Sequence, residues 1–452
     1  MSIKSNWSKS SVWAVAIASA VLLFTTFNLA RWKNHNVVIH DIQSYYSYLP
    51  ALFIYEDLSF NYKFEEGMDP IVVQNTWAMV TPEGKPVQKM SGGLSILYSP
   101  FFFISHGIAK ITNYAANGYS RPYQMGLGLS SVFYAILGML LMRKTLLRFF
   151  SEGAVALTVF SIYIGTNLFY YTVAEGAMSH NYSVFLISLL AFLVTQRLKK
   201  QQFLFSILVG TLIGLITIVR PINAIIALFP ALYWVLNKEK EVGKNWKHWI
   251  GVIIGGLLGI APQLIYWKYA TGDWIYYSYN DEGFFFSDPA LLKGLFGFRK
   301  GWLIYTPLMV LAWIGFIPLF KESKKLVASI VPVLALYIFV VFSWWCWWYG
   351  GSFGMRAMID CYTLLAFPLA ALAHWSLKQE ARLKRFMVPT LMLLFLGLNQ
   401  WQTFQYRKGI IHYDSMTAQA YQAAFLKAKY PKNYMQLIEA PDYDAAKKGE
   451  GR

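Results

Sequence analysis

Four charged residues stand where a polar site beside a membrane would need them. Asp41 comes shortly after the first long apolar run, and Lys89 precedes a Gly92-Gly93 pair. Arg220 joins two apolar runs with almost no loop between them, and Arg356 follows a glycine-rich stretch. A carboxylate can take a proton from a hydroxyl group, and Lys, Arg and glycine amides bind phosphate oxygens. These residue types could therefore accept a proton from a hydroxyl group and bind a phosphate group.

Each of these side chains also has a structural explanation, which the sequence leaves open. Asp41 could cap the N-terminus of a helix, since Asp is a favoured cap residue. Lys89 could lie on a flexible turn and extend its amine to the membrane surface. Arg220 needs an anionic partner at that depth, for which Glu175, Asp41 and a lipid phosphate are candidates.

The segment 343–360 is the most specific local pattern of the chain. Trp348 and Tyr349 belong to a cluster of aromatic residues that suits the apolar faces of sugar rings, although an aromatic belt at a span end is the simpler explanation. Glycines follow, and a chain without side chains can approach a ligand closely. Arg356 and Asp360 are four residues apart, which predicts a pair on one helix face.

Further polar residues are candidates for contacts with a sugar or an acceptor. Glu175 and His180 lie between two apolar runs, where ionisable groups tend to be functional or paired unless they are wet loop residues. Tyr45 belongs to an aromatic stretch that follows Asp41 and is fit to lie in the membrane interface. Tyr45, Glu175, His180, Trp348, Tyr349 and Asp360 complete the predicted site.

The composition indicates that the chain is a membrane protein. Of the 452 residues, 56% are hydrophobic and 14% are charged, whereas soluble domains carry about 25% charged residues. Apolar runs of about 20 residues recur, which predicts an all-α polytopic membrane protein. The net charge of +17 is explained by basic loops, and no basic block suggests nucleic acid. Two cysteines give neither a disulfide framework nor metal spacing.

The charges of the loops predict the topology. Lys and Arg collect in every second loop, at 143–148, 197–200, 238–247, 321–325 and 378–385. The positive-inside rule puts these loops and the N-terminus, with Lys4, in the cytoplasm. The predicted spans are 11–30, 123–142, 153–172, 180–196, 203–219, 221–237, 249–268, 301–320, 326–345, 357–376 and 385–402. Eleven spans result, and twelve or thirteen are possible because span boundaries are hard to predict.

This topology puts the functional candidates on one face. A transmembrane domain, 1–402, has a large outer loop of interfacial helices at 31–93 and an interfacial or re-entrant segment at 94–112. A small polar helical tail, 403–452, lies on the same outer face, which in a bacterium is the periplasmic side of the inner membrane. The 269–300 loop is predicted to be an aromatic and acidic flap over that face.

The pattern resembles the GT-C superfamily of membrane glycosyltransferases, especially the protein O-mannosyltransferase and aminoarabinose transferase families. The resemblance lies in the acid Asp41 after the first span, the stretch from Lys89 to Pro100, Arg121-Pro122 and the Gly350–Asp360 segment. It implies a GT-C-like bundle of about 11–13 helices that uses a polyprenyl-phosphate sugar donor.

The resemblance also implies roles for individual residues. Asp41 matches the catalytic acid of the first loop, Lys89 the contact to the lipid phosphate, and Arg356, more weakly, a phosphate or acceptor contact. Ile42 follows Asp41 where the O-mannosyltransferases have a second acid, which leaves a divalent metal possible but not required. The acceptor would be a lipid, a glycan or a protein.

Two other functions fit the composition. A transporter or lipid flippase would place polar residues toward both faces, whereas here they gather on one. A non-catalytic scaffold in envelope assembly would tolerate combined replacement of Asp41, Lys89 and Arg356. Membrane lipids are partners in each case.

Overall fold

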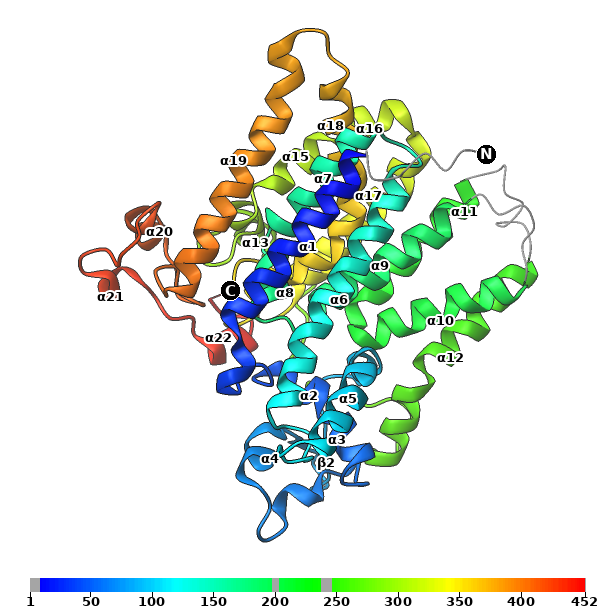
Figure 1. The fold of residues 1–452 in the computed structure, drawn as a ribbon, viewed down its shortest axis with the longest axis vertical. Coiled ribbons are helices and arrows are strands. Elements are labelled where there is room, and N and C mark those ends of the chain that lie inside the picture. The colour runs from blue at the N-terminus through cyan, green and yellow to red at the C-terminus, as the bar shows by residue number, and fades with distance from the viewer. Residues whose placement is uncertain (1–8, 197–202, 237–245, 452) are drawn as a thin grey trace.

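The computed structural model describes residues 9–196, 203–236 and 246–451, and these form an almost entirely helical molecule (Figure 1). Its one small sheet pairs β1 (Met79–Val80) antiparallel with β2 (Pro86–Val87) within the described residues. Lys4, the basic loop 197–200 and nearly all of the basic loop 238–247 lie outside the described residues.

The long helices coincide with the predicted apolar runs. They are α1 (Ser10–Leu29), α5 (Gly93–Ile111), α6 (Arg121–Leu146), α7 (Glu152–Ile164), α9 (Ser179–Thr195), α10 (Phe203–Val219), α12 (Trp246–Thr271), α17 (Lys324–Ser343), α18 (Tyr362–Leu377) and α19 (Arg382–Arg407). A helix satisfies its own backbone hydrogen bonds, which an apolar run inside lipid requires.

Shorter helices connect the long ones and build the loops. The α-helices are α2 (Asp41–Tyr46), α3 (Tyr48–Phe53), α4 (Pro70–Asn75), α8 (Leu168–Val173), α11 (Leu228–Leu236), α13 (Leu291–Phe296), α14 (Trp302–Tyr305), α15 (Leu308–Ile314), α16 (Phe316–Glu322), α20 (Ala418–Ala424), α21 (Tyr434–Leu437) and α22 (Tyr443–Lys447). The 3₁₀ helices are η2 (Arg31–Asn34), η3 (Asn61–Phe64), η4 (Pro221–Ala227) and η6 (Arg356–Cys361).

Helices long and apolar enough to cross a membrane confirm that the chain is an all-α membrane protein. In the described ranges six meet that standard: Ser10–Asn34, Gly93–Ile111, Arg121–Leu146, Trp246–Thr271, Lys324–Ser343 and Arg356–Leu377. The predicted span 385–402 lies in the 26-residue helix α19, which is long enough but does not meet the standard of apolar composition. The remaining predicted spans are shorter or interrupted, as at 301–320, where Pro307 and Gly315 separate α14, α15 and α16. The count of eleven to thirteen crossings stays a prediction. The segment 94–112 forms the continuous helix α5, and its interfacial placement is likewise still a prediction.

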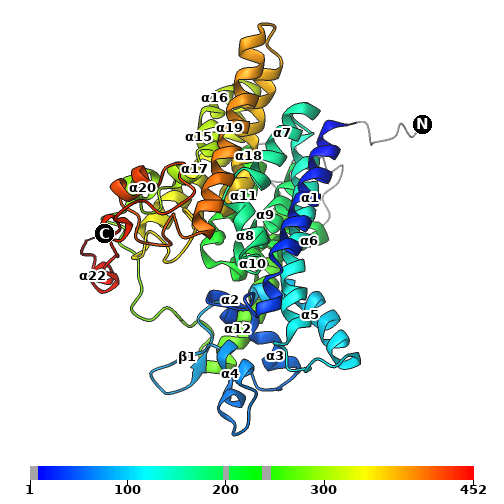
Figure 2. The ribbon, with the colours of Figure 1, turned by 60° about the vertical axis from the view of Figure 1, so that its left-hand side comes forward.

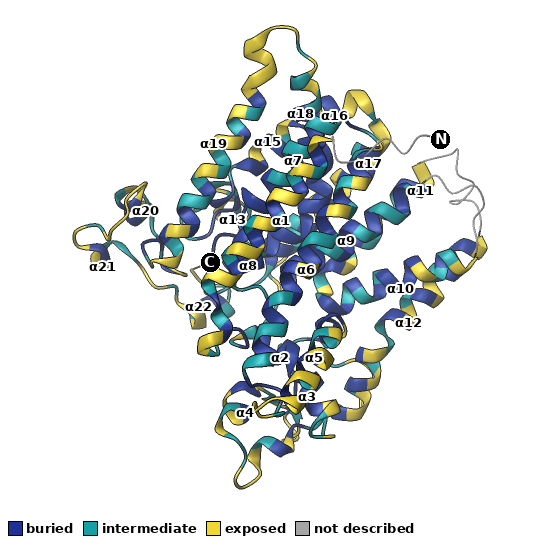
Figure 3. Ribbon diagram, in the orientation of Figure 1, coloured by how far each residue is buried: buried dark blue, intermediate teal, exposed yellow. Residues whose placement is uncertain are grey.

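The helices differ greatly in burial (Figure 3). The segment Arg356–Leu377, which includes α18, is almost wholly enclosed by its neighbours, whereas most residues of α1 and α12 are only partly buried or exposed. The loop 31–93 lies at the bottom of Figure 1, far from the N-terminus. In Figure 2 the connection after α12 runs from this loop toward the C-terminal tail. The segment that begins at Arg356 is therefore the packed centre around which the loops are arranged.

Helices α10 and α12 cross at very short range because glycines face each other. A Cβ atom at Gly210 or Gly214 would overlap the backbone of α12, and one at Gly255 or Gly259 would overlap the backbone of α10. Small residues allow such close packing between membrane helices.

We expect Gly255→Ala to destabilise the protein by about 1–3 kcal/mol, because its Cβ would overlap the carbonyl oxygen of Ile207 and force two backbones apart. The neighbouring change Gly256→Ala is the matched control, since its Cβ would lie 3.9 Å from the nearest atom outside its own helix, the carbonyl oxygen of Gly210. Thermal unfolding in detergent should separate the two variants. Equal melting temperatures for both would contradict this account of the crossing.

Candidate active site

A cavity of about 360 Å³ lies where the loops converge. Its wall includes all four charged residues selected from the sequence, together with Tyr45, His180 and Tyr349. The lining residues are Asp41, Tyr45, Lys89, Met90, Ser91, Met178, Ser179, His180, Val219, Arg220, Pro221, Ile222, Tyr277, Tyr279, Glu282, Phe284, Trp344, Trp345, Cys346, Tyr349, Gly350, Arg356 and Tyr443. Charged and aromatic side chains far apart in sequence thus share one partly open cavity.

Asp41 forms an ion pair with Arg356 inside this cavity. The Oδ2 atom of Asp41 lies 3.2 Å from Nη2 of Arg356, and both side chains remain partly accessible. Asp41 begins α2, and the residue before it, His40, occupies the cap position. Asp41 is therefore not the helix cap. The backbone of His40 has φ 52° and ψ −133°, a conformation that is costly for a residue other than glycine.

The predicted pairing of Arg356 with Asp360 is wrong. Residues Arg356–Cys361 form the 3₁₀ helix η6, in which three residues complete a turn, so side chains four residues apart point in different directions. Arg356 therefore points to Asp41, while Asp360 points to the opposite side and has no exposed surface.

Asp360 is instead the partner of Arg220. Its Oδ2 atom lies 3.3 Å from Nη1 of Arg220 and accepts a hydrogen bond of 2.9 Å from Nδ2 of Asn223. The hydroxyl of Tyr337 donates to Oδ1 of Asn223 at 3.0 Å. Neither of the two carboxylates predicted as partners, Glu175 and Asp41, pairs with Arg220, while a contact to a lipid phosphate stays a prediction. A buried cation is thus balanced behind the cavity wall.

His180 joins this network as an acceptor. Its Nδ1 atom lies 2.6 Å from Nη1 of Arg220 and 3.3 Å from Oδ1 of Asp360. A guanidinium can only donate hydrogen bonds, so the Nδ1 atom of His180 accepts from Arg220 and cannot also donate to Asp360. The imidazole therefore fixes the orientation of the Arg220 side chain at the cavity wall.

Lys89 is tied to the flap, which we define as residues 272–290. Its amine pairs with Glu282, stands 5.1 Å from the centre of the Tyr279 ring, and both charged side chains are largely buried. The hydroxyl of Ser278 donates to the carbonyl oxygen of Lys89 at 2.6 Å. Lys89 is thus held at the cavity wall by the flap.

Three predicted site residues lie away from the cavity lining. Glu175 accepts a 2.8 Å hydrogen bond from Tyr170 and lines a separate, much smaller hollow. Trp348 is buried against Tyr443, with 5.4 Å between ring centres. Asp360 supports Arg220 from behind. Conversely, Tyr443 and Glu282 were not selected from the sequence, although Glu282 belongs to the predicted acidic flap.

Burial affects two polar groups of the cavity wall outside the membrane spans. It raises the pKa of Tyr45, although Arg220 opposes the shift, so this phenol stays a hydrogen-bond donor. Burial also raises the pKa of the Cys346 thiol to about 11. Both groups are therefore mostly protonated near neutral pH.

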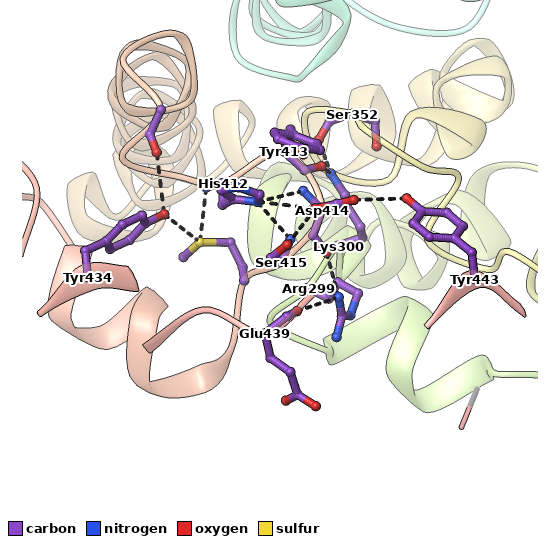
Figure 4. A network of polar contacts seen from close by, with 12 residues as sticks. Arg299, Lys300, Ser352, His412, Tyr413, Asp414, Ser415, Tyr434, Glu439 and Tyr443 are labelled. Atoms are coloured by element: carbon purple, nitrogen blue, oxygen red, sulfur yellow. Dashed lines mark hydrogen bonds and ion pairs between the residues drawn. The ribbon is translucent and has the colours of Figure 1, made fainter. Parts of the chain in front are cut away.

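A second network attaches the C-terminal tail to the loops of the cavity (Figure 4). The buried amine of Lys300 donates to the carbonyl oxygens of Ser352 and Tyr413. Asp414 accepts a 3.0 Å hydrogen bond from the hydroxyl of Tyr443, and Arg299 donates to the carbonyl oxygen of Asp414 at 2.7 Å. The tail is therefore part of the structure around the cavity.

Lys300 makes the stability of this attachment depend on pH. Burial lowers its pKa to about 7, against a partial opposing effect of Asp414. Above pH 7 the folded protein binds fewer protons at this site than the unfolded chain, so stability rises with pH until about 10.5 and is lost as pH falls toward 7. The slope approaches about 1.4 kcal/mol per pH unit for one proton.

We expect the difference in unfolding free energy between the wild type and Lys300→Met to grow between pH 7 and pH 10. Unfolding in detergent at several pH values measures that difference, and Lys293→Met, on the exposed part of the same loop, is the control. A difference that is flat with pH would show that Lys300 is charged in the folded protein.

Metal ligation has no obvious place in the described ranges, which contain no cluster of three or more His, Cys, Asp or Glu side chains able to hold an ion. Comparison with known proteins finds no matching family model and no significant match among curated sequences.

Proposed function

We propose that this protein is a membrane glycosyltransferase that moves a sugar from a polyprenyl-phosphate donor to an acceptor hydroxyl at the outer face. The observation that carries the proposal is the cavity, in which the carboxylate of Asp41 and the cations of Lys89, Arg220 and Arg356 meet among aromatic rings. A base, phosphate ligands and sugar-stacking surfaces are the parts that this reaction needs.

The cavity offers a polar and an apolar side to the proposed donor. Met178, Val219, Pro221 and Ile222 contribute apolar surface next to Arg220, which suits the first isoprene units beside a phosphate. The aromatic side chains of Tyr45, Tyr279 and Tyr349 suit the sugar. The phosphate would lie among the three cations, replacing the carboxylate that each now holds nearby.

The proposed reaction is a single displacement at the anomeric carbon. The acceptor oxygen forms a bond to that carbon while the bond from the carbon to the phosphate oxygen breaks, and the configuration inverts. Asp41 takes the proton of the acceptor hydroxyl, and the electron pair of the broken bond leaves with the polyprenyl phosphate. The cations stabilise the charge on this leaving group, and positioning supplies much of the remaining effect.

The pair of Asp41 and Arg356 links base and phosphate. When the donor phosphate draws Arg356 toward itself, the 3.2 Å contact between Arg356 and Asp41 opens, and the carboxylate is free to accept a hydrogen bond from the acceptor hydroxyl. The base would then be activated only when the donor is in place, which limits wasteful reaction.

The test is release of polyprenyl phosphate. Purified protein in liposomes would be given undecaprenyl phosphate linked to each of a panel of sugars, with an envelope extract as acceptor, and free undecaprenyl phosphate would be measured by mass spectrometry. Activity on one donor supports the proposal. Folded protein that turns over none of the panel, and whose deletion leaves envelope glycans unchanged, would contradict it.

The transporter alternative predicts a different result. A transporter must expose the cavity to both sides, so a cysteine placed beside Arg220 should react with impermeant reagents from either side of the membrane. Labelling from one side alone favours the transferase.

A further inference from the structure

Helix α22 closes one side of the cavity, although it belongs to the C-terminal tail. Tyr443 contributes to the cavity lining, and its ring stands edge-on to Trp345 and Trp348, with 6.2 and 5.4 Å between ring centres. Its hydroxyl donates to Asp414 at 3.0 Å (Figure 4). Tyr443 is thus held by its backbone in α22, by the packing of its ring and by the hydrogen bond of its hydroxyl.

An ion pair holds α22 against the flap. The amine of Lys447 lies 3.0 and 3.2 Å from the two carboxylate oxygens of Asp281 and 5.6 Å from the centre of the Trp345 ring. Lys447 follows Tyr443 by one helical turn, so both side chains occupy one face of α22. One face of α22 therefore contacts both the cavity and the flap.

Two consecutive acids of the flap bind two different segments around the cavity. Glu282 binds Lys89 of the first loop, and Asp281 binds Lys447 of the tail. The flap thus joins the two segments, and opening the contact between Asp281 and Lys447 removes one of the contacts that hold α22 without breaking any of the three ion pairs at the cavity.

We propose that α22 is the wall through which a water-soluble ligand reaches the cavity, with Tyr443 setting the size of ligand admitted and the pair of Asp281 and Lys447 holding the wall closed. The inference rests on the proposed function where it takes this ligand to be the sugar acceptor. Tyr443 is then a specificity-determining residue for the acceptor.

A native cysteine can be used to measure access to the cavity. Cys346 lines the cavity and is 5% exposed, whereas Cys361, its only other cysteine, has no exposed surface. The thiolate is the reacting form, and burial raises the pKa of this thiol to about 11, so labelling is measured at about pH 9 in every variant. Under these matched conditions, labelling of folded protein in liposomes by an impermeant thiol reagent reports access to the cavity, and Cys346→Ser gives the background.

The first experiment opens the ion pair. Lys447→Glu should raise the labelling rate of Cys346 by the small reagent 2-sulfonatoethyl methanethiosulfonate about fivefold, since exposed ion pairs are weak. Lys448→Glu changes the adjacent, exposed residue and should have no effect. The exchange Asp281→Lys with Lys447→Glu should restore slow labelling.

The second experiment tests the size limit. Tyr443→Ala should accelerate labelling by the bulky reagent fluorescein maleimide more than labelling by the small one. Tyr430→Ala removes an exposed tyrosine of the same tail, outside the cavity lining, and should accelerate neither.

Three results would overturn the proposal. Wild-type labelling as fast as that of Lys447→Glu would mean that α22 is no barrier. Equal acceleration of both reagents by Tyr443→Ala would mean that Tyr443 sets no size limit. Labelling of Cys346 only after denaturation in all variants would mean that ligands do not pass α22. None of these measurements needs catalysis. Their outcome therefore does not depend on whether the protein is a glycosyltransferase.

Discussion

Replacing Asp41 by Asn should lower sugar transfer about 10²- to 10⁴-fold, the usual contribution of a positioned acid or base. Asparagine keeps the size of the side chain but cannot take the proton of the acceptor hydroxyl. It also leaves Arg356 without its carboxylate partner at 3.2 Å, so this cation becomes more available to the donor phosphate. We therefore expect kcat to fall while binding of undecaprenyl phosphate is unchanged or tighter.

The combination of these two readouts separates a base from a structural residue. Asp273→Asn is the matched control, because it makes the same change at an exposed position of another connecting loop. A merely structural Asp41 would give parallel losses in transfer, donor binding and melting temperature. Undiminished transfer by a folded Asp41→Asn protein would remove Asp41 from the base role.

Replacing Asp360 by Asn should destabilise the protein by about 3–5 kcal/mol, the cost of leaving a buried charge without its partner. Arg220 would lose the carboxylate at 3.3 Å and keep only the hydrogen bond to His180. Unfolding of the variant in detergent measures this loss. The exposed change Asp273→Asn again serves as the control and should have no effect on stability.

A double replacement tests whether the loss comes from the uncompensated charge. Arg220→Gln with Asp360→Asn removes both charges, so the double variant should be more stable than the sum of the single effects predicts. Additive losses would show that Asp360 stabilises the protein through Asn223 and Tyr337 rather than through Arg220.

Composition and apolar runs are sufficient to predict the helical membrane fold, because a lipid environment permits few alternatives for an uninterrupted apolar segment. The loop charges also led to the prediction that Asp41, Lys89, Arg220 and Arg356 share one face, and all four line the same cavity. Charged residues are costly near lipid, so those found next to apolar runs are good candidates for a functional site. For this reason the charged part of the site could be predicted.

Partner choice was not predictable, because it depends on local backbone geometry and distant contacts. The spacing of Arg356 and Asp360 suggests an α-helical pair, but a 3₁₀ helix turns the two side chains apart. The contribution of Tyr443 depends on the path of the tail past Asp414, which no periodicity reveals. Trp348 was selected with its aromatic neighbours, yet a cluster pattern cannot distinguish the rings that line a cavity from those that pack behind it.

The pairing of every cation at the cavity affects how ligand binding responds to ionic strength. Lys89, Arg220 and Arg356 each have a carboxylate nearby, so an arriving phosphate exchanges one anion for another instead of joining a region of unbalanced positive charge. Long-range attraction that salt would screen is then small. Binding of a phosphate group should therefore vary little with salt concentration, and selection should depend on the fit of the ligand inside the cavity rather than on its charge at a distance.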